Sequence, residues 1–246
     1  MSDHSDHDVA ARLATEAGKL LLEVRNELAE ASQDERKAAG DERSHDFLMA
    51  SLAAERPGDA VLSEEGADDP IRLSADRVWI IDPLDGTREF SELGRDDWAV
   101  HVALWQSGEL VAGAVALPAQ GITLATPTIS APPPAPAKPR VVVSRTRPPA
   151  VALDVRAALD GVLVEMGSAG AKVASVVQGL SDVYVHAGGQ YEWDSAAPVA
   201  VARAAGLHTS RIDGSPLIYN RRDPRLPDVM VCRPELAEAV LSVTRD

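Results

Sequence analysis

The chain has 246 residues, and its 45% hydrophobic content is enough to bury a sizeable core in one domain or in two fused halves. Its 38 acidic and 24 basic residues give a net charge of −14, which disfavours nucleic acid and anionic membranes as partners. The single cysteine, Cys232, excludes an intrachain disulfide and a multi-cysteine metal site.

This acidic balance predicts bound metal ions, because a divalent cation is often the largest charge in its site and lets a small phosphorylated substrate bind. The N-terminal residues 1–9 lack a basic segment followed by an apolar run, and no stretch approaches the roughly 18 apolar residues of a membrane span. We therefore expect a cytoplasmic protein without a membrane partner.

The first part of the chain is predicted to form two helices and then a sheet. Apolar residues recur at helical spacing over residues 8–31, and a second helix carrying Phe47 is expected to end at Pro57-Gly58-Asp59. Short strands follow from Ala60, and we expect them to form an antiparallel meander. The predicted strands are residues 61–65, 78–82, 98–105, 110–117 and 121–126.

A proline-rich segment separates this part from the rest. Residues 127–139 cannot continue a sheet and predict a stiff linker between residues 1–126 and residues 140–246. Beyond it the pattern alternates between strand and helix, which is typical of βαβ units. The predicted order is strand 140–144, helix 150–159, strand 162–165, helix 169–179, strand 182–186, helix 194–205, two further strands and a terminal helix from Pro234.

The chemistry is concentrated in WIIDPLDGT, where an apolar strand runs into Asp82 and Asp85. A regular strand would place these carboxylates on opposite faces, but a turn at Pro83 is expected to let them converge, with the Leu84 carbonyl between them. Hard divalent cations bind such oxygen ligands. The alternative is a surface turn with solvated acids. An EF-hand is excluded, because Leu84 stands where a ligand belongs.

Three neighbouring features extend this motif. Gly86 and Thr87 open a loop whose backbone N–H groups suit a phosphate, and the Thr87 hydroxyl is placed to orient a water. Glu64, in the segment SEEG, ends the preceding predicted strand and is expected to lie beside Asp82. Asp194, in WDSAA, lies where a helix is predicted to begin, and a helix N-cap would explain it equally well.

Taken together, SEE, WIIDPLDGT and WDSAA resemble the inositol monophosphatase superfamily of lithium-sensitive, magnesium-dependent phosphatases. The resemblance implies an α+β fold, a layered αβαβα sandwich with an antiparallel-sheet half and a mixed-sheet half. It also implies that the chain is an enzyme with two or three Mg²⁺ ions per site, and it allows a homodimer.

The same resemblance implies the roles of individual residues. One magnesium would bind Glu64, Asp82 and the Leu84 carbonyl, a second would bind Asp82, Asp85 and Asp194, and a third, weaker ion would share Glu64. Asp41 would pair with Thr87 to hold the nucleophilic water, although Asp41 lies in an acidic segment where capping a helix start is an ordinary role. The implied catalytic residues are Asp41, Glu64 and Thr87, and the implied substrate contacts at the core are Glu64, Leu84, Asp85, Gly86, Thr87 and Asp194.

Within the superfamily, DGTREF at residues 85–90 resembles the D-G-T-K-E-F of the subgroup that hydrolyses 3′-phosphoadenosine 5′-phosphate. Two further stretches resemble that subgroup and imply a nucleotide pocket: VSR at residues 143–145, and Gly167-Ser168 followed by Lys172. In the first, Arg147 stands where a histidine is common, and in the second Ala169-Gly170 alters the spacing. An inositol monophosphatase or a fructose-1,6-bisphosphatase is the alternative. The implied pocket residues are Ser144, Arg145, Arg147, Gly167, Ser168 and Lys172.

The histidines form no metal-ligand spacing, so we predict that they are structural or exposed. They are His4, His7, His45, His101, His186 and His208.

Overall fold

The computed structural model describes residues 5–245, and it begins with two long helices, α1 (Asp6–Glu27) and α2 (Gln33–Glu55). Ser32 caps α2 in a capping box with Glu35, which fixes the helix start eight residues before Asp41. Asp41 therefore lies inside α2, and the alternative role considered for it, capping a helix start, is wrong. None of the helices within residues 5–245 combines the length and the apolar composition of a membrane span.

The first sheet has the strand order β1-β2-β3-β4-β5. From β2 to β5 each strand pairs antiparallel with the next, as predicted. The first pair differs, because β1 runs parallel to β2. Residues 64–76 join these strands, and a connection of about a dozen residues is long enough for the crossover that a parallel pair needs. The strands are β1 (Ala60–Ser63), β2 (Arg77–Asp85), β3 (Ala99–Gln106), β4 (Glu109–Leu117) and β5 (Ile122–Ala125).

The second sheet has the order β7-β6-β8-β10-β9 and mixes both pairings. Strand β6 runs parallel to β7 and to β8, whereas β10 is antiparallel to β8 and β9. The alternation of strand and helix predicted from the sequence is present. The strands are β6 (Arg140–Ser144), β7 (Val162–Met166), β8 (Val183–Tyr191), β9 (His208–Ser210) and β10 (Arg225–Cys232).

The remaining helices are short. They are α3 (Thr87–Ser91), α4 (Ala150–Ala158), α5 (Ala169–Val177), α6 (Glu192–Ala204) and α7 (Ala237–Thr244), with 3-10 turns η1 (Pro70–Ser74), η2 (Pro118–Gln120) and η3 (Pro234–Leu236).

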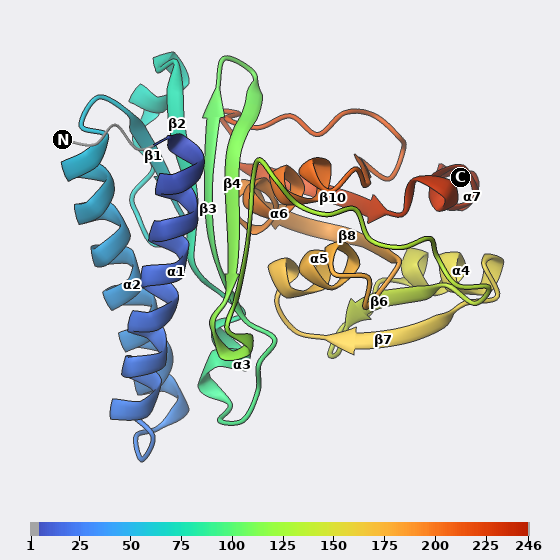
Figure 1. Ribbon diagram of the computed structural model, residues 1–246, viewed down its shortest axis with the longest axis horizontal. Coiled ribbons are helices and arrows are strands. Elements are labelled where there is room, and N and C mark those ends of the chain that lie inside the picture. The colour runs from blue at the N-terminus through green and yellow to red at the C-terminus, as the bar shows by residue number, and fades with distance from the viewer. Residues whose placement is uncertain (1–4, 246) are drawn as a thin grey trace.

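The elements stack in five layers (Figure 1). Helices α1 and α2 cover the outer face of the first sheet and share a core with Trp79 and Ile81. Helices α5 and α6 lie between the sheets, in the core that includes Val78 and Ile80. Helices α4 and α7 cover the far face of the second sheet. The predicted αβαβα sandwich is confirmed.

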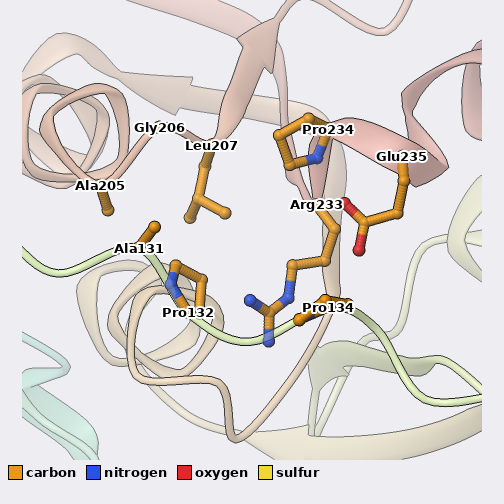
Figure 2. Close-up of a pocket in the computed structure, with 9 residues that line it drawn as sticks. All are labelled: Ala131, Pro132, Pro134, Ala205, Gly206, Leu207, Arg233, Pro234 and Glu235. Atoms are coloured by element: carbon orange, nitrogen blue, oxygen red, sulfur yellow. The ribbon is translucent and has the colours of Figure 1, made fainter.

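The proline-rich segment crosses from β5 to β6 along the second half. The N–H of Ala135 donates to the Glu235 carboxylate at 2.8 Å, which holds the segment against η3. A pocket of about 390 Å³ lies beside it, and Figure 2 shows the residues that line this pocket, among them Arg233. The buried side chain of Arg233 pairs with Asp182 at 3.3 Å. The predicted metal ligands lie elsewhere. The division into two halves joined by a linker stays a prediction.

Candidate active site

A β-bulge in β2 brings Asp82 and Asp85 to one face of the first sheet. Asp82 pairs with His101 and Asp85 pairs with Ala99, so β2 has one residue more than β3 between these pairs. The extra residue reverses the alternation of side chains, which is how bulges redirect residues beside active sites. The Leu84 N–H donates to Asp82 Oδ1 at 3.0 Å and fixes the bulge. Convergence thus comes from a bulge within the strand, whereas the sequence predicted a turn after it.

Asp194 joins this pair from the second half of the chain. Ligand atoms of Asp82, Asp85 and Asp194 all lie within 4.8 Å of one another. Asp194 is not the N-cap of α6, as the sequence allowed. Tyr191 is the N-cap, and its N–H donates to Asp194 Oδ2 at 2.6 Å. This hydrogen bond fixes the carboxylate at the helix start, where it faces the end of β2.

Asp85 is held by the N-terminus of α5. The hydroxyl of Ser168 and the N–H of Gly170 each donate to Asp85 Oδ2 at 2.5 Å, and the N–H of Ala169 donates to Oδ1 at 3.1 Å. Burial alone would raise the pKa of Asp85, but the facing His101 ring and these donors outweigh it and lower the pKa to about 2. Asp85 therefore carries a charge that the protein itself stabilises.

The other acids of the cluster are destabilised as anions. Burial and repulsion from Glu64 and Asp85 raise the pKa of Asp82 well above its usual range, and Asp82 Oδ2 has no hydrogen-bond partner among the described residues. Burial and the charge of Asp85 raise the pKa of Asp194 to about 6. Glu64 is exposed at the rim, yet desolvation by its surroundings and repulsion from Asp194 raise its pKa to about 7. A divalent cation would offset the repulsion between the carboxylates and would bind the Asp82 oxygen that has no hydrogen-bond partner. The donor set therefore fits a hard metal ion.

Thr87 and Asp41 lie next to this cluster. Thr87 Oγ1 is 3.1 Å from the Leu84 carbonyl oxygen and 3.4 Å from Asp41 Oδ1. Gly86 precedes α3 in the left-handed conformation, with φ of 84°, which favours glycine. Burial and repulsion from Glu65 raise the pKa of Asp41 to about 7, against the hydrogen bond from Thr87. The structure thus brings together Asp41 and Thr87, as the sequence predicted.

The residues predicted to form a nucleotide pocket have other partners in this structure. Arg145 pairs with Glu89 at 2.6 Å and with Glu92 at 2.8 Å. Lys172 is buried and donates to the carbonyl oxygens of Gly167 and Ser168, so it stabilises the chain before α5. The hydroxyl of Ser168 binds Asp85, as described above. Ser144 accepts from the N–H of the exposed Arg147 at 3.3 Å. Contacts of these residues with a substrate stay predictions.

His101 is the residue of this site that the sequence analysis missed. Its buried ring lies on β3 beside the acids, with Nε2 3.2 Å from Asp85 Oδ2 and Nδ1 3.8 Å from Asp82 Oδ2. Burial opposes a charged ring, but the Asp85 carboxylate outweighs it and raises the pKa of His101. The available signal was strand alternation, because His101 occupies the face opposite that of Val100 and Val102 in the outer core. His4 lies outside the described residues.

Comparison with known proteins agrees with this geometry. The sequence profile of the inositol monophosphatase family matches residues 3–130 and 140–246. The chain is 54% identical over 240 residues to the 3′-phosphoadenosine 5′-phosphate phosphatase of Mycobacterium tuberculosis (strain CDC 1551 / Oshkosh), covering 94% of this chain and 90% of that protein. It is 29% identical over 235 residues to the 3′(2′),5′-bisphosphate nucleotidase CysQ of Escherichia coli (strain K12), covering 88% and 94%.

Two solved structures are similar to this one. CysQ from Bacteroides thetaiotaomicron superimposes with a TM-score of 0.75 at 28% identity, covering 92% of this chain and 96% of that one. Inositol monophosphatase-II from Staphylococcus aureus MSSA476 superimposes with a TM-score of 0.80 at 20% identity, covering 97% and 94%. The second likeness bears on the fold alone.

Proposed function

We propose that this chain, which belongs to the inositol monophosphatase family, removes the 3′-phosphate of 3′-phosphoadenosine 5′-phosphate. The observation that carries the proposal is the cluster of Asp82, Asp85 and Asp194, in a chain that is 54% identical to a phosphatase named for this substrate. The sulfated relative, 3′-phosphoadenosine 5′-phosphosulfate, is a further proposed substrate, which would place the reaction in sulfur assimilation.

The proposed cofactor is Mg²⁺, with two or three ions per site. Asp82, Asp85 and Asp194 would hold one ion, and Glu64 with the Leu84 carbonyl would complete a second site around Asp82. When bound, such ions lower the pKa of a coordinated water and neutralise the departing oxygen of the ester. The buried Asp82 Oδ2 supports this assignment, because it has no hydrogen-bond partner within residues 5–245 and a bound cation would supply one for the ionised carboxylate.

Asp41 and Thr87 are proposed to hold the attacking water. The Asp41 carboxylate lies within reach of the Thr87 hydroxyl, and its raised pKa of about 7 suits a group that accepts a proton near neutral pH. Gly86 and Thr87 would hold the phosphate through their backbone N–H groups. These roles need no covalent phosphoenzyme.

Asp41→Asn should lower kcat by about 10²- to 10⁴-fold, the usual contribution of a positioned base, with little change in KM. Phosphate release at saturating Mg²⁺ measures this effect. Glu42→Gln is the matched control, because Glu42 is the exposed neighbour on the same helix and should leave both constants unchanged. An effect of Asp41→Asn on KM alone would assign Asp41 to substrate binding.

A flat aromatic surface beside Asp194 supports a nucleotide substrate. The exposed ring of Tyr191 stacks on Trp193 with a centroid distance of 4.6 Å and an interplanar angle of 4°. A base stacked on an aromatic ring contributes about 1–3 kcal/mol, whereas inositol phosphate has no base to stack. Tyr191 is therefore proposed as a contact of the adenine.

The direct test is phosphate release from 3′-phosphoadenosine 5′-phosphate, inositol 1-phosphate and fructose 1,6-bisphosphate with Mg²⁺. We expect the nucleotide to be the best substrate and lithium to inhibit. Tyr191→Ala should lower kcat/KM for the nucleotide by about 5- to 150-fold and leave inositol 1-phosphate unaffected, while Tyr191→Phe keeps the ring and the activity. A parallel loss on both substrates would assign Tyr191 to support of Asp194. A preference for a sugar phosphate would establish the alternative function.

Two further predictions from the sequence belong to this proposal. A homodimer is one, and sedimentation of the purified chain tests it. A cytoplasmic location is the other, and cell fractionation tests it.

A further inference from the structure

The His101 ring lies where β2, α5 and α6 meet, the three elements that carry or hold the proposed metal ligands Asp85 and Asp194. Its ring nitrogen Nδ1 donates to the Trp193 carbonyl oxygen at 3.0 Å, and Nε2 faces Asp85 Oδ2 at 3.2 Å. Trp193 immediately precedes Asp194 in the first turn of α6. The ring thus contacts both Asp85, at the end of β2, and the main chain that carries Asp194.

We propose that His101 is a positioning residue that sets the separation of Asp85 and Asp194, and so the geometry of the metal site between them. His101 is not itself part of the set of ligand atoms that lie within 4.8 Å of one another. His101 would therefore orient the residues that bind the metal ion and would not bind the ion itself. The inference rests on the proposed metal-dependent function.

The packing around the ring shows that α5 is fitted to it. A Cβ atom at Gly170 would lie 1.9 Å from His101 Nε2, so any side chain at position 170 collides with the ring. The absence of a side chain lets α5 approach closely enough for the Gly170 N–H to reach Asp85 at 2.5 Å. His101 and Gly170 are consequently a matched pair, with Asp85 held between ring and helix.

Position 101 is also rigid. The side chain has no exposed surface, and its backbone lies in the centre of β3, paired with Asp82 on one side and with Val115 on the other. The ring cannot turn away without losing the Trp193 carbonyl. A rigid bridge of this kind holds two carboxylates at a fixed distance before a metal ion binds, which spares the ion the cost of ordering them.

The matched pair gives a test that separates positioning from packing. His101→Ser removes both contacts of the ring and opens the space that a methyl group at position 170 needs. Gly170→Ala alone keeps the ring and introduces the collision. The double variant, His101→Ser with Gly170→Ala, fills the opened space again but restores neither contact.

Three quantities are measured for each full-length variant: the Mg²⁺ dissociation constant by calorimetry, the melting temperature in chelator, and the substrate KM at saturating Mg²⁺. His101→Ser should weaken Mg²⁺ binding by about 10- to 100-fold and change KM by less than about threefold. Gly170→Ala should lower the melting temperature. The double variant should recover the melting temperature lost in Gly170→Ala and retain the weak Mg²⁺ binding of His101→Ser.

Recovery of Mg²⁺ affinity together with the melting temperature in the double variant would show that His101 only fills space, and would overturn the inference. Unchanged Mg²⁺ affinity in His101→Ser would overturn it as well. His208→Ser is the control, because His208 lies on β9 and contacts Ser210 at 3.0 Å, away from the carboxylates. Failure of the proposed function would appear differently, as absent Mg²⁺ binding or absent phosphate release in the unaltered protein.

Discussion

Replacing Asp82 by asparagine is expected to lower phosphate release by more than about 100-fold and to raise the melting temperature of the metal-free protein. This loss of activity is larger than the one expected when a residue that only orients a metal ligand is removed. The carboxylate is buried and repelled by Glu64 and Asp85, and one of its oxygens has no hydrogen-bond donor among the described residues. A neutral amide removes the repulsion and also removes a proposed ligand of the metal ion. The rise should grow as the pH increases, because burial and repulsion raise the pKa of Asp82 and a larger fraction of the carboxyl is ionised at higher pH.

Asp85→Asn is the matched comparison, because it should be equally inactive but less stable. Asp85 accepts hydrogen bonds from Ser168, Ala169 and Gly170, and hydrogen bonds to a charged group contribute about 1.5–3 kcal/mol each. Thermal unfolding in chelator and phosphate release at saturating Mg²⁺ measure the two effects. Near-normal activity of either variant, or shifts of the two melting temperatures in the same direction, would contradict this division of roles.

Mg²⁺ should bind more tightly as the pH rises from about 6 to about 8, with release of protons. Glu64 and Asp194 have pKa values of about 7 and about 6 in the metal-free protein, and a carboxyl must lose its proton before it can coordinate. Affinity should therefore increase by up to about tenfold per pH unit for each proton displaced. Calorimetric titration in two buffers of different ionisation enthalpy counts these protons, and a count of zero would contradict the assignment.

The same two carboxyl groups should make the free energy of unfolding of the metal-free protein decrease as the pH rises over a defined range. Carboxyl groups in an unfolded chain titrate near pH 4, so between about pH 4 and pH 7 the folded chain retains protons at Glu64 and Asp194 that the unfolded chain has lost. Folding then binds protons, and the stability of the metal-free protein falls as the pH rises through this range. Saturating Mg²⁺ should reverse that trend, which melting curves with and without chelator would show.

Much of the fold followed from the sequence because the apolar patterns are local. The period of the apolar residues identified the longer helices and most strands, and Pro and Gly marked their ends. The short helix α3 was missed, because a loop was predicted from Gly86 and Thr87. The parallel pairing of β1 was missed, because it depends on how residues 64–76 cross the sheet and not on the pattern of β1 itself. The alternative role of Asp41 as a helix cap failed because the helix start is set by the capping box at Ser32, which lies outside the short acidic segment around Asp41.

The candidate site divides in the same way. The motifs identified Asp82, Asp85 and Asp194 as candidate ligands, because the acidic residues and the turn residues beside them can be recognised in the sequence. The partners of Arg145 lie at a distant segment, α3, which no local pattern indicates. Lys172 instead donates to the carbonyl oxygens of Gly167 and Ser168, directly before its own helix, and the motif alone does not indicate this contact. His101 escaped notice because a lone histidine in an apolar strand is usually structural, and only the register with Asp82 reveals its neighbours.

The way Asp85 is held has a consequence for how this site can change during evolution. Two of its donors are main-chain N–H groups, of Ala169 and Gly170, which no substitution except proline removes as long as α5 keeps its start. Residue 169 can therefore vary among residues other than proline, whereas residue 170 is also restricted by the His101 ring beside it. Homologous proteins can thus keep these hydrogen bonds to the aspartate with different residues at the start of the helix. A structural search for an aspartate that faces a helix start will therefore find related proteins that a sequence alignment overlooks.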